Sequence, residues 1–504
     1  MTGALSDLGS LLANVWFGSS SRRLAAGVRA RDLEGRDLLR LGIDIACRAA
    51  HQASLADEHG EFIWSGRRFF TASRDLEDLW QSLPAGTEAA EVMVVMEPTR
   101  NAWVPLAAWF RRRGARVVLV PPEQSADLRA YYSKHTKTDR LDSKILARLP
   151  MLHPDGLHAD HGLGPADALR RAVKIRSGLV KQRSTAFARI DALLEILGPG
   201  WFAAFSADLG NTTPLRFLAA GYAEPNTVKR LGRARLGRFF YRHSRGRWSE
   251  PEAERLLAAA EETLLLWNDE LDYSDLAEDI ALHARLALRI NNELKELDDR
   301  IRVMLQGLDP NGIITSAPGI AQITGAAILG RLGDPARFHS LAGVRSFSGL
   351  VPSLEASGLS VKHGAPTKQG DAVLREALFI AADHARRVDP QLASRYHRLM
   401  VLVGKHHNSA VCHVATNLLT RVVACWRRGE RYVIRDLAGR PISVDEGRQI
   451  VAEHFSVPDE LRAGRRQLAA QRRRRERANR RSQESLSAPS PRPPRLEGTP
   501  LVRS

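Results

Sequence analysis

The sequence predicts an α/β domain in its first third, followed by a mostly helical remainder. Short apolar runs separated by turn residues fill the first third and have the length of β-strands, whereas later apolar residues recur every three or four positions, as in amphipathic helices. The chain has 504 residues, of which 44% are hydrophobic. It is therefore long and apolar enough for roughly two to four domains with substantial cores.

The predicted elements of the first domain form a three-stranded meander and then alternate. Strands are expected at 41–46, 51–57 and 61–70, with a turn at Gly60. The elements that follow are helix 73–83, strand 92–97, helix 102–113, strand 116–120, and helices 125–133 and 139–149. This order is that of an α/β RNase H-like fold, which we assign to residues 41–150.

Composition and periodicity divide the rest of the chain. We expect a basic arm at 1–40, a helical region at 151–309, a mainly α domain at 310–440 and a basic, disordered tail at 441–504. Apolar residues at alternating four- and three-residue spacings form a heptad seam in the helical region: Ile290, Leu294, Leu297, Ile301, Met304 and Leu308. Two accounts of this seam remain open, helix packing inside one chain and a dimerising coiled coil.

The charge of the chain predicts a polyanionic partner. The formal net charge is +17, which favours nucleic acid or an anionic membrane. No apolar run of about 20 residues occurs, so we expect no membrane span. Cys47, Cys412 and Cys425 lie far apart and form no zinc or redox pair. We therefore expect a cytoplasmic, nucleoid-associated protein without a secretion signal.

Four acids are candidates for a metal site. Asp44 lies within the first apolar strand and Glu97 ends another, where a charge is costly unless it is compensated. Asp139 and Asp142 are three residues apart on a predicted helix and share one face. If that helix crosses the strand ends, four carboxylates converge, and such hard oxygen ligands suit Mg²⁺ or Mn²⁺ in phosphoryl transfer. Taken singly, each acid is equally well a helix cap or a salt-bridge partner.

Basic residues flank the acids on the predicted helix. Lys137 and Arg140 are candidates for contact with nucleic acid. A solvated helix face is the alternative.

A glycine-rich turn opens an apolar helix at residues 316–327 (SAPGIAQITGAA). Backbone N–H groups at such a turn can hold a phosphate without reading bases. Gly319 and Gly325 are therefore candidate nucleic-acid contacts, and the segment resembles a helix-hairpin-helix element. A packing corner between helices is the alternative.

Ser357 is a candidate nucleophile. It precedes Gly358, in a predicted loop followed by Lys362, His363 and Lys368. A small neighbour permits close approach to phosphorus, and cations offset the charge of the transition state. A Ser-Gly pair in a loop is also commonly no more than a turn.

The first domain resembles a known family. The segments LGIDIACRAAHQASLAD, VVMEPTRNAWVPLAAWFRRRGARVVLVPPEQ and KHTKTDRLDSKILAR resemble the N-terminal DEDD domain of IS110-type transposases. The resemblance implies a RuvC-like fold in which the four acids bind metal. Ala46 and Cys47 stand where the family often has Gly-Lys, and Arg100 where many members have Gly or Ser. Neither departure changes a carboxylate.

A second segment, at 317–382, resembles the transposase domain of the same family. The resemblance implies that Ser357 is the catalytic nucleophile, although Leu359 replaces a frequent second Gly. The resemblance covers about 41–150 and 310–425. Nearby serines are the alternatives to Ser357: Ser353 first, then Ser348 and Ser360.

Together the two segments imply a recombinase that acts on donor and target DNA. Ser357 would form a transient phosphoserine link beside Mg²⁺, and two DNA partners imply a homodimer or homotetramer. Similarity to the family also implies an element-encoded guide RNA that pairs with both DNAs. Two alternatives stay open: a RuvC-like endonuclease that uses a metal-bound water, and an inactive nucleic-acid-binding protein.

Overall fold

The computed structural model describes residues 38–468 except 133–137, 153–156, 161, 206–209, 269, 339, 358–359 and 369, together with 470–471 and 474–475. The expected arm at 1–40 therefore lies almost wholly outside the described residues. The described chain falls into two compact units. Unit 1 lies within 1–310 and 329–343, and unit 2 within 311–328 and 344–504.

Unit 1 begins with a mixed sheet in the order β3-β2-β1-β4-β5-β6. Its first three strands form the antiparallel meander, β4 and β5 run parallel to β1, and β6 is antiparallel to β5. The strands are β1 (Leu39–Asp44), β2 (His51–Ala56), β3 (Phe62–Phe69), β4 (Val92–Met96), β5 (Arg116–Leu119) and β6 (His158–Ala159). The five expected strands are all present, and the short β6 was not predicted.

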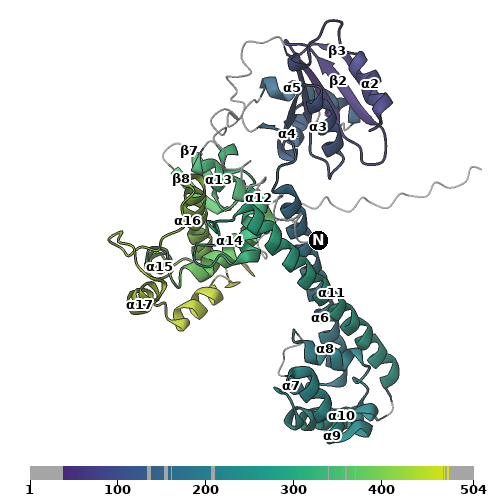
Figure 1. Ribbon diagram of the computed structural model, residues 1–504, viewed down its shortest axis with the longest axis vertical. Coiled ribbons are helices and arrows are strands. Elements are labelled where there is room, and N and C mark those ends of the chain that lie inside the picture. Colours follow the sequence, from purple (N-terminus) through teal and green to yellow (C-terminus); the bar gives the residue numbers. More distant parts are fainter. Residues whose placement is uncertain are drawn as a thin grey trace, which may run out of the picture. The chain divides into compact units, whose positions relative to one another are not determined.

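Helices cover both faces of this sheet (Figure 1). One face carries α2 (Ser73–Gln81) and α3 (Trp103–Arg112), and the other carries α4 (Pro122–Tyr132) and α5 (Asp139–Leu152). Alternate residues of β4 serve the two cores: Val94 packs with α2 and α3, and Val95 with α5. Every residue of β4 is buried, which explains why this strand is a continuous apolar run. A short turn, η2 (Ala89–Glu91), leads into β4.

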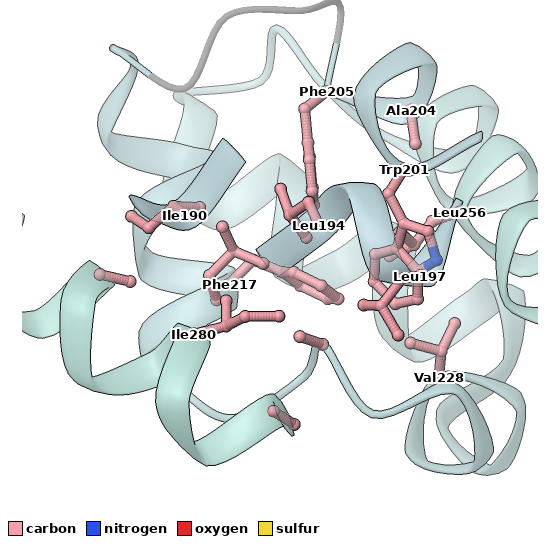
Figure 2. Packing of buried hydrophobic residues seen from close by; sticks show 14 of the residues in the cluster. Ile190, Leu194, Leu197, Trp201, Ala204, Phe205, Phe217, Val228, Leu256 and Ile280 are labelled. Atoms are coloured by element: carbon pink, nitrogen blue, oxygen red, sulfur yellow. The ribbon is translucent and has the colours of Figure 1, made fainter. Parts of the chain in front are cut away.

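A helical region follows the sheet in unit 1. It contains α6 (Asp167–Leu197), α7 (Gly200–Ala204), α8 (Thr212–Ala219), α9 (Pro225–Ser244), α10 (Glu250–Trp267) and α11 (Tyr273–Leu308). Figure 2 shows side chains from these helices meeting in one apolar core. Trp201 is fully buried there, and its indole N–H donates to Thr263 Oγ1 at 2.9 Å. The polar edge of the largest core side chain is thus satisfied.

The heptad seam lies on α11, which packs along α6. Arg176 on α6 donates to Asp298 at 2.5 Å and Arg183 donates to Asn291 at 3.1 Å, so the two helices run antiparallel. Seam residues such as Ile301 are buried within the chain. Packing inside one chain therefore accounts for the seam. Among the described helices, none is long and apolar enough to cross a bilayer.

Unit 2 is mainly helical and contains one β-hairpin. Its boundary with unit 1 passes through α12 (Gln322–Leu332) and α13 (Leu341–Ser348), on either side of η3 (Pro335–Arg337). The remaining elements are β7 (Pro352–Ser357), β8 (Ser360–Pro366), α14 (Ala372–Ala385), α15 (Pro390–His397), the π-helical turn η4 (Arg398–Leu402), α16 (His407–Arg428) and α17 (Val444–His454). Helix α16 packs against α14 and α15, and α15 also packs against α17. The hairpin was not predicted.

The prediction of a disordered tail from residue 441 is wrong for its first part. Helix α17 begins with a capping box, in which the Glu446 amide donates to Ser443 Oγ at 3.2 Å and the Ser443 amide donates to Glu446 Oε2 at 2.7 Å. Gly447 lies against the Val388 carbonyl, with no room for a Cβ atom. The prediction rested on the basic residues further on, whereas the cap and this contact fix the chain before them. Residues 476–504 lie outside the described part.

Candidate functional site

Asp44 and Glu97 occupy equivalent positions at the ends of neighbouring parallel strands. The last registered pair of β1 and β4 is Ile43 with Met96, and each strand continues with an acid. Both acids are half-buried. The carboxyl ends of parallel strands are the usual location of ligand sites in α/β sheets. The sequence therefore sets two carboxylates at one edge of the sheet.

Helix α5 crosses β1 at Gly42. A Cβ atom at this position would overlap the carbonyl oxygen of Ser143 and the amide nitrogen of Ala147, both on α5. Ser143 Oγ also hydrogen-bonds with Ser54 Oγ at 2.8 Å, and Ser54 is the β2 partner of Gly42. Only glycine permits this close approach, because every other residue carries a Cβ atom.

The direction of α5 brings two more acids to the same edge. Leu146 and Leu149 pack with Leu38, which precedes β1, so α5 runs antiparallel to β1. Its first turn, with Asp139 and Asp142, therefore lies toward the end of β1 that carries Asp44. Asp139 is exposed and Asp142 is half-buried.

Helix α4 supplies partners to two of the acids. Arg129 Nη1 donates to Asp142 Oδ2 at 2.8 Å, and Ser125 Oγ donates to Glu97 Oε2 at 2.6 Å. Within the described part of the chain, Asp142 Oδ1 is buried without a hydrogen-bond partner. Ser125 and Arg129 were not among the predicted site residues, although their spacing of four residues on a helix indicates a shared face.

The four acids share an edge without forming a closed cluster. In the described ranges, no three His, Cys, Asp or Glu side chains lie close enough together to hold a metal ion. The chemistry of the site nevertheless suits a divalent cation, because hard carboxylate oxygens surround the edge. The Oδ1 atom of Asp142 also favours a cation at this edge, because a buried acceptor left unsatisfied costs about 1–3 kcal/mol.

The basic residues predicted beside the acids have different outcomes. Arg140 is exposed, and its Nη2 donates to Ser65 Oγ on β3 at 2.9 Å. It therefore lies over the meander and is not paired with an acid. Lys137 lies outside the described residues. A contact of either residue with nucleic acid stays a prediction.

Ser357 belongs to unit 2 and ends a strand. It is the last residue of β7 and pairs with Ser360, the first residue of β8. The expected loop is therefore a hairpin, whose tip at 358–359 lies outside the described residues. Strands β7 and β8 consist mostly of small and polar residues, so they lack the continuous apolar run that would have predicted a strand.

The predicted basic residues beyond the tip lie on β8 and after it. In the register of the hairpin, Lys362 pairs with Glu355 and His363 with Leu354. Lys368 follows β8, is exposed, and donates its amide to the Gly349 carbonyl at 3.2 Å. The roles of these three residues on nucleic acid stay predictions.

The two glycines of the predicted phosphate turn are packing positions. Gly319 (φ +79°) lies against the backbone of α14, where a Cβ atom would overlap the Ala381 carbonyl oxygen. At Gly325 a Cβ atom would lie 3.1 Å from the Thr315 side chain. Turns, and no helix, occupy 311–321 before α12. The geometry thus supports the packing corner in place of a helix-hairpin-helix element.

Both units match families of known proteins. Residues 41–199 match a DEDD transposase model of IS110 type, and residues 311–397 match the transposase IS116/IS110/IS902 family. The first match spans all four acids and the second spans Ser357.

Proteins of insertion elements are similar to most of the chain. The mini-circle putative transposase for IS117 from Streptomyces coelicolor is 25% identical over 417 residues, which cover 78% of this chain and 94% of that protein. An uncharacterized 43.6 kDa protein of insertion element IS110 from the same species is 23% identical over 360 residues, covering 69% and 84%. A 44.8 kDa protein of IS116 from Streptomyces clavuligerus is 26% identical over 324 residues, covering 64% and 78%.

Proposed function

Since the chain belongs to the IS110 family of insertion-element transposases, we propose that it cuts and rejoins DNA through a serine–phosphate intermediate. As a transposase it is an enzyme whose substrates are DNA. The observation that carries the metal half of the proposal is the edge shared by Asp44, Glu97 and the first turn of α5. At this edge one buried oxygen of Asp142 has no partner among the residues that the structure describes.

The first domain is proposed to have an RNase H-like, RuvC-like fold. Three features support this assignment: a meander of three strands, two further strands parallel to β1, and helices on both faces. In such a fold the central parallel strands end where the acids lie, so the chemistry belongs at that edge.

Asp44, Glu97, Asp139 and Asp142 would hold the divalent cation, Mg²⁺ or Mn²⁺. When bound, the cation supplies charge stabilisation to the phosphoryl oxygens of the substrate. The residues around the acids set their orientation. Ser125 orients Glu97 by its hydrogen bond, Arg129 balances the charge of Asp142, and the contact of α5 with Gly42 fixes the first turn of the helix.

Ser357 is the proposed nucleophile. Its Oγ forms a bond to the phosphorus of a DNA phosphodiester as the bond from phosphorus to one deoxyribose oxygen breaks. The Oγ proton leaves to the solvent or to the departing oxygen. A deoxyribose hydroxyl of the second DNA then attacks the phosphoserine and releases the serine. One phosphodiester is made for each one broken, so rejoining requires no ATP.

Donor and target DNA, an element-encoded guide RNA and a second copy of the chain are the proposed partners. The net charge of +17 supports a polyanionic assembly. Base pairing by a guide RNA would supply specificity while the protein reads backbone and shape. Sequencing of the RNA that copurifies with the protein tests this part, and a purely random population of cellular RNA contradicts it. Light scattering with DNA bound tests for a dimer or tetramer.

The decisive experiment detects the covalent intermediate. The protein is incubated with Mg²⁺, the RNA transcribed from the flanks of the element and labelled donor and target DNA, and denaturing gels reveal protein–DNA adducts. We expect an adduct that disappears in Ser357→Ala and in Asp142→Ala and persists in the control Ser353→Ala. Nicked DNA without an adduct, unchanged in Ser357→Ala, would establish the metal-dependent endonuclease instead. Binding without any cleavage would establish an inactive binding protein.

A further inference from the structure

The helical region of unit 1 carries a basic segment that the catalytic proposal does not use. Residues 225–249, which span α9 and the turn to α10, contain eight Lys and Arg residues and no Asp or Glu. Most of these side chains are exposed. Like charges crowded on one helix repel each other and destabilise it unless a partner offsets them. Binding of an anionic ligand would therefore reduce the repulsion between these side chains and stabilise the segment.

Acidic neighbours neutralise only part of this segment. Arg233 pairs with Glu250 and Glu254, at 2.6 Å in each case. In the described part of the chain, no carboxylate pairs with the five exposed arginines that follow. We call these five residues the arginine surface: Arg235, Arg238, Arg242, Arg245 and Arg247.

The geometry of α9 collects these charges. Arg235, Arg238 and Arg242 follow the i, i+3, i+7 spacing of one helix face. The helix ends at Arg245 in the left-handed conformation (φ +59°), which turns the chain back toward α10. Three arginines thus line one helix face, and two more follow at the turn.

Two pockets lie beside the arginine surface. The first has a volume of about 710 Å³ and is lined by residues that include Arg235, Arg238, Tyr241, Arg242 and His243. The second, of about 290 Å³, is lined by residues that include His243, Arg245 and Arg247. Cationic walls around a hollow strengthen the attraction of an anion.

His243 lies in the wall of both pockets, and its pKa responds to the positive charge around them. Burial, followed by the charges of Arg216 and Arg242, lowers the pKa of His243. Arg216 Nη1 lies 3.3 Å from His243 Nδ1. The charges of both guanidinium groups act on this ring, and a bound anion would offset them.

We infer that the arginine surface binds the phosphate backbone of duplex DNA at a site separate from the catalytic acids. Guanidinium groups bind phosphate oxygens in a bidentate manner, and successive backbone phosphates offer the repeated anion that a row of arginines requires. DNA is the substrate class of the family, so it is the polyanion to which we commit. The inference uses that substrate class and does not use the role of Ser357.

The test compares two triple variants of the full chain with equal net charge. One removes the surface: Arg238→Ala, Arg242→Ala and Arg245→Ala. The control removes three exposed arginines of α11 that also lack a carboxylate partner within the described residues: Arg285→Ala, Arg289→Ala and Arg300→Ala. Circular dichroism melting establishes that both variants are folded. Fluorescence anisotropy then measures the affinity for a labelled duplex of an element end between 50 and 200 mM salt.

We expect the surface variant to bind DNA roughly tenfold more weakly or worse, and its salt slope to become shallower by about two to three. The control variant is expected to stay near the wild-type protein. Equal binding by the two variants would overturn the inference. A loss of affinity for structured RNA of the same length with DNA binding unchanged would also overturn it, in favour of an RNA site. The readout is binding without turnover, so a failure of the proposed role of Ser357 does not alter the result of this test.

Discussion

Arg129 on α4 donates a hydrogen bond of 2.8 Å to Asp142 on α5, and the second oxygen of that carboxylate is buried without a partner among the described residues. Both side chains are mostly buried, with 24% and 13% of their surfaces exposed. The guanidinium thus offsets the charge of an acid that we propose as a metal ligand. A cation that binds Asp142 must share the carboxylate with Arg129 or displace it.

Removal of Arg129 should therefore tighten cation binding. We expect Arg129→Gln to bind Mn²⁺ roughly three- to tenfold more tightly than the wild-type protein, because one nearby positive charge is lost. Calorimetry and Mn²⁺ EPR on the DNA-free protein measure this without turnover. Arg140→Gln is the matched control, since Arg140 lies on α5 and contacts Ser65 in place of an acid. Weaker binding by Arg129→Gln would mean that Arg129 positions Asp142 for the metal.

The contact between Gly42 and α5 predicts a second effect. In Gly42→Ala the new methyl group overlaps backbone atoms of Ser143 and Ala147, which cannot rotate away. We expect a loss of about 1–3 kcal/mol of stability, and Mn²⁺ affinity should fall because α5 carries two of the acids. Gly178→Ala on α6, where no atom lies within 4 Å of the added Cβ, is the control and should be neutral or slightly stabilising. A wild-type melting curve for Gly42→Ala would contradict the close packing.

Much of the first domain could be predicted because its signals are local. Strand β4 is a continuous apolar run, and a strand buried on both faces produces that pattern. Asp44 and Glu97 were identified because a charge at the end of such a run is unusual. The partners of the acids could not be predicted in the same way. Arg129 and Ser125 reach them only through the packing of α4, which no local pattern determines.

Other predictions failed because the same local sequence is compatible with two different structures. The turn at Gly319 has the glycines of a phosphate-binding turn, yet here the missing Cβ makes room for α14. Only the position of a helix more than 50 residues later distinguishes the two roles. The basic composition of the tail likewise concealed α17, whose capping box at Ser443 precedes the charged segment.

A buried polar network in unit 2 predicts a large effect on stability. Asp389 is 1% exposed and caps α15. Its carboxylate accepts from Tyr432 Oη at 2.6 Å and from Arg421 Nη1 at 3.4 Å. Asp389→Ala removes the cap of α15 and the acceptor of the half-buried Tyr432 hydroxyl, whereas Arg421 keeps Gln391 as an acceptor at 2.8 Å. We therefore expect a loss of about 2–3 kcal/mol, against about 1 kcal/mol for Tyr432→Phe. Hydrogen exchange of the amides of α15 and α16 in urea measures both.

The control for this network is Asp445→Ala, whose side chain is 89% exposed in its pair with Arg448. It should leave the exchange of α15 and α16 unchanged. Protection in Asp389→Ala equal to that of this control would show that the network is not needed for stability.

The turn after Glu97 carries strain that glycine would relieve. Arg100 has a φ of +50°, in the left-handed region that costs a residue with a Cβ atom roughly 1–2 kcal/mol. Part of that gain is lost to the greater freedom of glycine in the unfolded chain, so Arg100→Gly should stabilise the domain by about 0.5–1 kcal/mol. Arg100→Ala removes the same charge and keeps the strain, and it should bring no such gain. Thermal melting of the two variants side by side checks the difference.

His51 gives the sheet edge a pH dependence. The ring is 4% exposed, its Nδ1 accepts from the Ala46 amide at 3.1 Å, and its Nε2 hydrogen-bonds with Thr71 Oγ1 at 2.8 Å. Burial lowers the pKa of His51. The unfolded chain therefore takes up the proton more readily than the folded one. The stability that the neutral ring provides is complete above the ordinary histidine pKa of about 6.5 and is lost as the pH falls toward the lowered value.

A variant that cannot titrate isolates this effect. His51→Asn keeps an acceptor for the Ala46 amide and carries no ionisable group. We expect the stability advantage of the wild-type protein over His51→Asn to shrink between pH 7.5 and pH 5.5, because only the wild-type ring is penalised by protonation. Hydrogen exchange of the β1 and β2 amides, measured at both pH values, gives the stability of this part of the sheet separately from the rest of the chain. An advantage that stays constant across this range would mean that His51 takes up no additional proton when the chain unfolds. Any pH response of the edge would then have to come from its carboxylates.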